Sequence, residues 1–393
     1  MTRPTIRLRP RADARRIRHG HPWAFADDLV LDRRAKAIPP GTVATLEDAE
    51  RRPLATVAVN PLSRIAVRVL DPDPEAAIDR AWLRAKVAAA AALRAPLYDA
   101  PFHRLIHAEG DGLPGVVADR FGAAVVIQPN AAWAEALLDD LAHAVAEVTG
   151  AETILKSASG RARGAEGLDD VDAVLRGAMP DAPVPVPMNG ATYLADLAGG
   201  QKTGLFYDQR PNHAFAARLA RGRVLDVFSH VGGFGLAALA GDAAHATCVD
   251  GSAPALALAE GGAEAMGLRA RLTTTKADAF DAMDALRGET FDHVVADPPA
   301  FAPAKPALEK GLRAYERVAR LAAPLVAEGG WLTLCSCSHA ADLGKFHAAC
   351  TRGIGRAGRR GVLVRTGFAG PDHPVHPMLA ETGYLKALTF RLA

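Results

Sequence analysis

Apolar and polar positions alternate over short distances in the first 72 residues, a pattern that predicts strands rather than helices. Turn signals such as Pro39-Pro40-Gly41 and Asn60-Pro61 separate the apolar runs. We therefore expect a small β-rich domain over residues 1–74, ended by the prolines of Asp71-Pro72-Asp73-Pro74. The expected strands are 42–46, 54–59 and 65–70.

The next part of the chain mixes two periodicities. Residues 75–95 and 131–148 carry the alanine-rich, charge-spaced pattern of amphipathic helices, and short apolar runs between and after them predict strands. This favours a separate α+β domain over residues 75–187. Its last stretch, 177–187, holds four prolines and is expected to be a stiff linker. The expected strands are 105–108, 116–119, 123–128 and 153–156.

From about residue 188 the pattern becomes a repeated strand, loop and helix. Such alternation is typical of the α/β class and predicts a mostly parallel, doubly wound sheet over residues 188–393. The expected strands are 224–228, 246–250, 271–275, 293–296 and 331–336. The expected helices are 235–239, 253–266, 279–287 and 308–327.

Charge is nearly balanced overall but unevenly distributed. Lys plus Arg is 46 and Asp plus Glu is 44, which gives a net charge of +2. Residues 1–20 nevertheless carry seven arginines against the single acid Asp13, and residues 344–371 contain bases but no acid. We interpret both segments as local phosphate contacts. A solvated face in an arginine-rich composition is the alternative.

Cysteine content and hydropathy indicate the cellular compartment in which the protein is expected. The four cysteines show no spacing of a disulfide framework, so free thiols in a reduced compartment are expected. No apolar segment follows the arginine-rich start, and no apolar run is long enough to cross a bilayer. We expect a cytoplasmic protein with no membrane contact.

One apolar strand ends in a glycine-rich turn that opens into a helix, at Val227-Phe228-Ser-His-Val-Gly-Gly-Phe-Gly235. Gly232, Gly233 and Gly235 would let the backbone approach a ligand, and the helix N-terminus would bind an anion such as the carboxylate of S-adenosylmethionine. Two alternatives stay open, a dehydrogenase and a purely structural turn. The dehydrogenase is weakened because the turn lacks the order G-x-G-x-x-G.

Acidic residues end the next two strands. Asp250 lies 18 residues after Gly232 and is placed to accept hydrogen bonds from a ribose diol. Asp278 follows the third strand and could bind an adenine amino group. Both positions fit the adenosine part of the same cofactor.

Asp297 ends the fourth strand and is followed by Pro298 and Pro299. The prolines stiffen the backbone, and in an open parallel sheet this edge borders the ligand crevice. An acid or amide before Pro-Pro here is the signature of methyltransferases that act on planar nucleobases, where it can bind the base edge beside the methyl donor. The alternative is a simple Asx-Pro turn without a ligand.

The fifth strand leads into Leu334-Cys-Ser-Cys-Ser-His339. Carbon 5 of a pyrimidine becomes nucleophilic only after a thiolate adds to carbon 6, so this chemistry needs a cysteine. We favour Cys337 as the nucleophile and Cys335 as the second candidate. Residues two apart on a strand share a face, so one cysteine could be catalytic and the other a packing neighbour. A buried apolar role for either cysteine and a Cys335-Cys337-His339 metal site are the alternatives.

As a set, these residues resemble the PUA-domain-containing bacterial methyltransferases that make 5-methylcytosine in 23S ribosomal RNA, which are class I S-adenosylmethionine-dependent enzymes. The resemblance covers nearly the whole chain. Its further motifs are Gly20-His-Pro-Trp-Ala-Phe25, Asp111-Gly-Leu-Pro-Gly115, Asp119-Arg-Phe-Gly122, Gln201-Lys-Thr-Gly-Leu-Phe-Tyr-Asp-Gln-Arg210, Asp372-His-Pro374 and Gly383-Tyr-Leu-Lys386.

The resemblance implies a PUA domain, a small α+β domain and a Rossmann-like methyltransferase domain. It implies S-adenosylmethionine as cofactor, no metal, and 23S ribosomal RNA, free or in an assembling large subunit, as partner; a homodimer is also considered. Cys337 and Asp297 would be catalytic. The cofactor would contact Phe228, Gly232, Gly233, Asp250, Asp278 and Asp297, and the RNA would contact Pro298, Phe301, Lys202 and Arg16.

This chain departs from the family at several positions. His230 and Val231 stand where tyrosine and threonine are frequent, and Ala300 and Glu316 stand where lysine is common. No cysteine lies beside Asp297, so a second cysteine that helps to release the product would have to be Cys335. The remaining alternatives are a guanine methyltransferase, an RNA-binding assembly protein with a vestigial cofactor pocket, and a small-molecule methylase.

Overall fold

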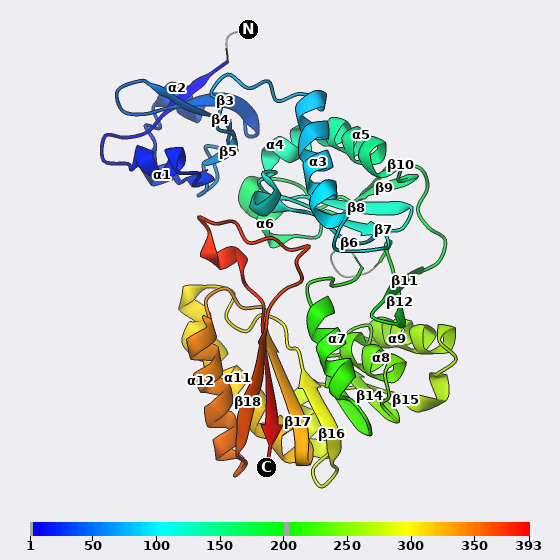
Figure 1. Ribbon diagram of the computed structural model, residues 1–393. Coiled ribbons are helices and arrows are strands. Elements are labelled where there is room, and N and C mark those ends of the chain that lie inside the picture. The colour runs from blue at the N-terminus through cyan, green and yellow to red at the C-terminus, as the bar shows by residue number, and fades with distance from the viewer. Residues whose placement is uncertain (1–2, 200–203) are drawn as a thin grey trace. The chain divides into compact units, whose positions relative to one another are not determined.

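The computed structural model describes residues 3–199 and 204–393, which form two compact units (Figure 1). The first unit contains residues 3–180 and Pro371–Thr382. The second contains residues 181–199, 204–370 and 383–393. Across both described stretches, no helix is long and apolar enough to cross a membrane.

A five-stranded sheet in the order β1-β3-β4-β5-β2 forms the start of the first unit. Strand β1 runs parallel to β3, and the other neighbours are antiparallel. Inward-facing aliphatic side chains such as Leu46 and Val57 form its core. The elements are β1 (Thr5–Arg7), α1 (Ala14–Arg18), β2 (Trp23–Ala24), α2 (Arg33–Lys36), β3 (Thr42–Glu47), β4 (Pro53–Val59) and β5 (Val67–Asp71).

The second sheet of this unit has the order β10-β9-β8-β7-β6, with only β8 and β9 parallel. Helices α3 and α5 pack against each other and bury Val87, Leu141 and Val145 in the core of this sheet. The elements are α3 (Arg80–Arg94), β6 (Phe102–His107), β7 (Val116–Phe121), β8 (Ala124–Pro129), α4 (Ala132–Ala136), α5 (Leu138–Thr149), β9 (Thr153–Lys156), α6 (Arg161–Glu166) and β10 (Ala173–Arg176).

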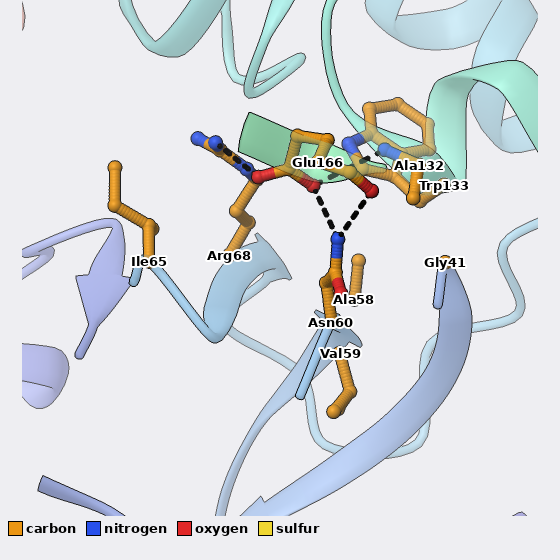
Figure 2. A pocket seen from close by; sticks show the side chains of 9 residues that line it. All are labelled: Gly41, Ala58, Val59, Asn60, Ile65, Arg68, Ala132, Trp133 and Glu166. Atoms are coloured by element: carbon orange, nitrogen blue, oxygen red, sulfur yellow. Dashed lines mark hydrogen bonds and ion pairs between the residues drawn. The ribbon is translucent and has the colours of Figure 1, made fainter. Parts of the chain in front are cut away.

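Buried polar contacts at Glu166 join the two sheets of the first unit (Figure 2). The Glu166 carboxylate accepts hydrogen bonds from Asn60 Nδ2 at 2.9 Å and Ser63 Oγ at 2.8 Å, and it pairs with Arg68 at 3.0 Å. Arg68 also pairs with Glu109 at 3.2 Å. The cavity beside them is about 10 Å³, room for one water molecule at most, so we assign it no ligand.

The second unit is built on a seven-stranded sheet in the order β15-β14-β13-β16-β17-β19-β18 (Figure 1). The first five of these strands are parallel, β19 runs antiparallel to β17, and β18 runs antiparallel to β19. This confirms the mostly parallel doubly wound sheet. The strands are β13 (Arg223–Val227), β14 (His245–Asp250), β15 (Leu272–Lys276), β16 (Phe291–Ala296), β17 (Val326–Ser336), β18 (Gly361–Gly367) and β19 (Lys386–Leu392).

Helices cover both faces of this sheet, with α7, α8 and α9 in one group and α10, α11 and α12 in the other (Figure 1). Aliphatic side chains from α11, α12 and the central strands form the largest core cluster. The helices are α7 (Arg210–Leu219), α8 (Gly233–Ala240), α9 (Ala253–Ala265), α10 (Ala279–Ala285), α11 (Leu308–Ala322) and α12 (Leu343–Arg356). Short 3₁₀ helices are Ala26–Asp28, Ala108–Asp111, Arg269–Arg271, Lys305–Ala307, Ala323–Leu325 and Ala380–Thr382.

The proline-rich segment expected to be a linker is instead half of a hairpin. Strand β11 (Val184–Met188) pairs with β12 (Ala191–Ala195) in a two-stranded sheet. Pro185 and Pro187 are exposed while Val186 and Met188 are buried. Because β11 has only one neighbour, proline's missing N–H can face away from the ladder.

Two predicted helices are shorter or broken. The helix expected over 131–148 is divided into α4 and α5 at Leu137, whose φ is −110°. The helix expected over 308–327 ends at Ala322, because Pro324 lacks the N–H that would continue it. Strand β17 therefore begins at Val326, five residues before the expected start.

Candidate active site

The glycine-rich turn after β13 has an unusual backbone. Phe228, His230 and Gly232 all have positive φ, at 62°, 48° and 79°. Only glycine adopts this region without cost, so Phe228 and His230, which both precede α8, have strained backbones. Strain of this kind is concentrated at ligand sites and fits a turn that presents backbone amides to a bound molecule.

A buried carboxylate anchors this turn from below. Asp226 Oδ2 accepts hydrogen bonds from the backbone N–H of Phe234 at 3.1 Å and of Gly235 at 2.8 Å, in the first turn of α8. Burial raises the pKa of Asp226 to about 7, against the lowering effect of these two amides. Asp226 thus holds the helix N-terminus to the sheet.

The other glycines of the turn are needed for packing. A Cβ on Gly235 would lie 2.5 Å from Cys248 Sγ, and one on Gly233 would lie 2.8 Å from His213 Nε2. Packing within the protein is therefore a second reason for glycine at these two positions, and the close approach to a ligand stays a prediction. Of the three glycines, only Gly232 has a positive φ.

Carboxylates follow β14 and β15 as expected. Asp250 accepts backbone N–H groups from His230 and Ser252, each at 2.8 Å and on different oxygens. Asp278 caps α10 through Oδ1, which accepts from Phe280 at 2.8 Å and Asp281 at 3.2 Å. Each carboxylate oxygen has two lone pairs, so both groups keep acceptor capacity for hydroxyl or amino groups.

Three aromatic rings lie together near these acids. Phe228, Phe280 and Phe301 have centroid separations of 6.2, 6.3 and 6.4 Å. Apolar rings beside two carboxylates and a helix N-terminus match the needs of an adenosine with an amino-acid tail. The residues present therefore fit S-adenosylmethionine, which when bound supplies an electrophilic methyl group.

The acceptor side of the site is centred on Asp297, directly after β16. Its backbone N–H donates to Val227 O at 3.2 Å, which ties the loop to β13. Gln209 Nε2 donates to Asp297 Oδ2 at 2.9 Å, and Gln209 Oε1 accepts from Asn212 Nδ2 at 2.8 Å. The half-buried Asp297 carboxylate is thus held in one orientation, next to buried Pro298.

A network of buried hydroxyl groups surrounds Cys337. The Tyr315 hydroxyl accepts from Ser336 Oγ at 2.9 Å and lies 2.7 Å from Ser338 Oγ. Ser338 Oγ also accepts from the backbone N–H of Ala302 at 2.9 Å. Both serines beside the cysteine are therefore anchors, and they join the loop after β17 to the loop after β16. The thiol between them is half-buried.

Lys386 supports the same loop from β19. Its Nζ donates to Ser338 O at 2.7 Å and Ala341 O at 2.8 Å. Burial lowers the pKa of Lys386 to about 8, against the raising effects of the Cys337 thiol and the Asp342 carboxylate. Lys386 is therefore a cation that interacts electrostatically with Cys337.

Cys335 differs from Cys337 in its surroundings. Only 1% of Cys335 is exposed, and it packs with Phe234, Val295 and Ala387. Burial, and next the Asp297 charge, raise the pKa of its thiol well above the usual value, which argues against Cys335 as a nucleophile. Within the part of the chain that the structure describes, no group of three or more His, Cys, Asp or Glu residues is arranged to hold a metal ion.

Comparison with protein families supports this geometry. Residues 6–72 match the model of a PUA-like domain, and residues 175–352 match that of an S-adenosylmethionine-dependent methyltransferase. A ribosomal RNA large subunit methyltransferase of Deinococcus radiodurans is 34% identical and aligns over 99% of this chain and 98% of its own length. The ribosomal RNA large subunit methyltransferase I of Shewanella denitrificans is 33% identical and aligns over 98% of this chain and 99% of its own length. The chain belongs to this methyltransferase family.

A solved structure gives the same fold. A crystal structure of a protein assigned as a methyltransferase, in complex with S-adenosylhomocysteine (SAH), matches this methyltransferase with a TM-score of 0.83 over 100% of both chains, at 20% identity. S-adenosylmethionine is the cofactor of the family, as the glycine turn and Asp250 predicted. The PUA-like start and the class I fold are confirmed as well. The boundaries of a three-domain division and a homodimer stay predictions.

The structure of the methyltransferase brings most of the predicted site residues into one unit. They lie at the carboxyl ends of parallel strands: Phe228, Gly232, Gly233, Asp250, Asp278, Asp297, Pro298, Phe301 and Cys337. Arg16 lies in the first unit, exposed, with a guanidinium nitrogen 2.7 Å from His21 Nε2. Lys202 lies outside the described residues. The individual roles given to these residues stay predictions.

Several cations of the acid-free segment 344–371, which is expected to contact phosphate, also bind groups of the second unit. Arg352 and Arg356 pair with Glu316 of α11, and Lys345 pairs with Asp342. Arg359 donates to backbone carbonyls, including Val326 O at 2.6 Å. Acids and backbone carbonyls outside the segment thus bind four of its cations, and the phosphate contact expected of the segment stays a prediction.

Sequence reasoning missed three residues that hold the methyltransferase site. Gln209, Tyr315 and Lys386 each bind a residue far away in the chain. Gln209 and Lys386 lie within motifs of the family resemblance, but the sequence pattern assigns neither residue a role. Tyr315 carried no signal beyond an apolar position on a helix.

Tyr315→Phe is expected to lower kcat about tenfold with little change in the Km for RNA, because Ser336 and Ser338 would lose the hydroxyl that holds the Cys337 loop. The free energy of unfolding should fall by about 1–3 kcal/mol. Methyl transfer and urea unfolding measure the two effects. Thr333→Val is the matched control, because it removes a buried hydroxyl bonded to His293 and Thr389 within the sheet. Equal kcat losses in both variants would show that Tyr315 acts only through stability.

Proposed function

We propose that this methyltransferase transfers the methyl group of S-adenosylmethionine to carbon 5 of a cytosine in 23S ribosomal RNA, through a covalent adduct of Cys337. The observation that carries the proposal is the half-buried thiol of Cys337, the first residue after β17, which pairs with the strand that Asp297 directly follows. A methyltransferase that acts on an exocyclic nitrogen does not need such a thiol.

The chemistry assigns a step to each group. The Cys337 thiolate forms a bond to carbon 6, and the electron pair of the C5–C6 double bond makes carbon 5 nucleophilic. Carbon 5 would take the methyl group as the methyl–sulfur bond of the sulfonium breaks, with the electron pair left on that sulfur. A base then removes the C5 proton, and the C5–C6 double bond re-forms as the C6–S bond breaks and returns the thiolate. Lys386 stabilises that thiolate both before attack and after release.

Asp297 orients the base in this proposal. Its carboxylate accepts a hydrogen bond from the exocyclic amino group of cytosine, which is a donor that uracil lacks. Gln209 holds the carboxylate for this contact. Pro298 and Phe301, on the same loop, would contact the face of the base.

The relatives' names and the PUA-like domain support large-subunit ribosomal RNA as the substrate. PUA-type recognition of folded RNA relies on shape and backbone contacts, for which exposed Arg16 is one candidate. A ribosomal RNA substrate also agrees with the cytoplasmic location expected from the sequence.

Base-resolution mapping of 5-methylcytosine in 23S ribosomal RNA, with and without the gene, tests the proposal. We expect the loss of one modified cytosine, restored by the wild-type gene and not by Cys337→Ala. An unchanged 5-methylcytosine map would exclude the cytosine assignment. A lost methylguanine in its place would support the guanine alternative.

A further inference from the structure

Two arginines share one aromatic ring at the surface of the second unit. The guanidinium carbon of Arg365, on β18, lies 4.4 Å from the ring centroid of Phe215, on α7. The guanidinium carbon of Arg218, one turn further along α7, lies 5.4 Å from the same centroid. A guanidinium that stacks on a ring keeps its N–H edge available for hydrogen bonds.

This pair lacks the acids that accompany the other arginines nearby. Neither Arg218 nor Arg365 forms an ion pair with any carboxylate of the described residues. Arg365 is half-buried, and its pKa is lowered by burial and then by the Arg218 charge, against a raising effect of Cys335. Two close cations with no acid between them are an unfavourable arrangement unless an anion binds there.

The pair also lies on the ligand edge of the sheet. Strand β18 runs parallel to β16 and β17, so Arg365 is near the carboxyl end that also carries Asp297 and Cys337. Gly367 is opposite Ala387, and Ala387 is opposite Cys335, so Gly367 lies two strands, or about 10 Å, from Cys335.

Packing connects the pair to the residues that hold Asp297. A Cβ on Gly367 would lie 2.1 Å from Asn212 Oδ1 and 3.3 Å from the guanidinium carbon of Arg365, so only glycine fits. Asn212 donates to Gln209, which donates to Asp297. Next to Gly367, the side chain of Phe368 is 53% exposed. Exposed aromatic rings beside arginines are typical of surfaces that bind single-stranded nucleic acid.

We propose that Arg218 and Arg365 bind a backbone phosphate of the substrate RNA next to the target nucleotide, with Phe215 as the platform that orients both guanidinium groups. This inference rests on the proposed RNA substrate and adds a phosphate site on the second unit itself. Phosphate contacts fix the register of a nucleic acid without reading its sequence. Here they would hold the strand while one base enters the site at Asp297.

The test is RNA binding at several salt concentrations. The probe is deproteinised large-subunit ribosomal RNA from cells that lack the gene, measured by filter binding with wild type, Arg365→Gln and Arg218→Gln. We expect each variant to bind about fivefold more weakly at 0.1 M salt. The slope of log affinity against log salt should become less steep by about 0.7, the value for one lost single-strand phosphate contact.

Arg360→Gln is the matched control. Arg360 is exposed at the amino end of the same strand, on the opposite edge of the sheet, and the charge change is identical. It should bind RNA like wild type. Equal losses for Arg360→Gln and Arg365→Gln, or an unchanged slope in both Arg365→Gln and Arg218→Gln, would overturn the proposal. Arg218 is exposed, so its variant keeps the test valid if Arg365→Gln folds poorly.

Methyl transfer separates this inference from the proposed function. Arg365→Gln should raise the Km for RNA about fivefold and leave kcat within about twofold of wild type. If 5-methylcytosine forms normally and the salt slope does not change, the phosphate site is wrong while the cytosine assignment stands. If the slope changes but no 5-methylcytosine forms, the cytosine assignment is wrong while the phosphate site stands.

Discussion

Cys337→Ala is expected to lower 5-methylcytosine formation by at least about 10³-fold, the largest effect of any substitution in this protein, because no other group can add to carbon 6 of the base. The fold should not change, since Cys337 is half-buried and the serines on either side of it anchor the loop through hydrogen bonds to Tyr315 and Ala302. Transfer of a radiolabelled methyl group to unmethylated 23S RNA measures the loss. Calorimetry with S-adenosylmethionine should show unchanged cofactor affinity.

Cys335→Ala is the matched control for this experiment. It removes a thiol from the same segment, but one that is buried and held un-ionised by its surroundings. Its kcat should stay within about threefold of wild type, with a modest loss of stability from the small cavity. If Cys337→Ala retained activity and Cys335→Ala lost it, the nucleophile assignment would have to be reversed.

A trapping experiment tests the adduct itself. RNA transcribed with 5-fluorocytidine has no proton at carbon 5 of its cytosines, so the last elimination step cannot occur and the C6–S bond should persist. Wild-type protein should then give an RNA–protein band that survives denaturing electrophoresis. Cys337→Ala should give none. A persistent band with Cys337→Ala would place the covalent bond elsewhere.

Much of this site could be anticipated because its residues follow strands directly. Apolar periodicity is local, and parallel strands bring their carboxyl ends to one edge of a sheet. In the structure Asp250 is the last residue of its strand, and Asp278 and Asp297 lie within two residues after theirs. Knowing the class of the sheet was therefore enough to group these acids.

The supporting residues could not be found in this way. Gln209 binds a residue 88 positions away, and Lys386 binds one 48 positions away. The contact of Lys386 depends on β19 running antiparallel next to β17, and the alternating pattern that identified the parallel strands does not predict that insertion. Positions of this kind follow from tertiary pairing, and local sequence contains no trace of them.

The distribution of charge along the sequence is not enough to show which cations are available to RNA. The segment 344–371 has no acid of its own, yet Glu316 pairs with its residue Arg356 from 40 positions away. Within the same segment, Arg365 forms no ion pair with a carboxylate of residues 3–199 or 204–393. A run of bases in the sequence therefore does not identify the cations available to RNA; that depends on which acids the fold brings close.

Asp297→Asn is expected to lower kcat/Km about 10²- to 10³-fold. The two side chains are nearly equal in size, but asparagine replaces an acceptor oxygen with an NH₂ donor. Gln209 Nε2 donates to Asp297 Oδ2, while Gln209 Oε1 is already used by Asn212. An asparagine at 297 would turn its oxygen toward that amide and present its own NH₂ to the cytosine amino group. Two donors would then face each other, and the base could not be held. Methyl transfer to 23S RNA measures the loss.

The double variant Gln209→Glu with Asp297→Asn should reverse part of this loss. A glutamate at 209 would accept from the asparagine NH₂ and from Asn212, so the asparagine oxygen would again face the cytosine amino group. We expect at least a tenfold gain in kcat/Km over Asp297→Asn alone, whereas Gln209→Glu alone should be impaired because two carboxylates would meet. Additive losses in the double variant would mean that Gln209 does not orient Asp297. A purely structural role for Gln209 predicts that additivity, because removing a packing contact cannot restore the direction of a hydrogen bond.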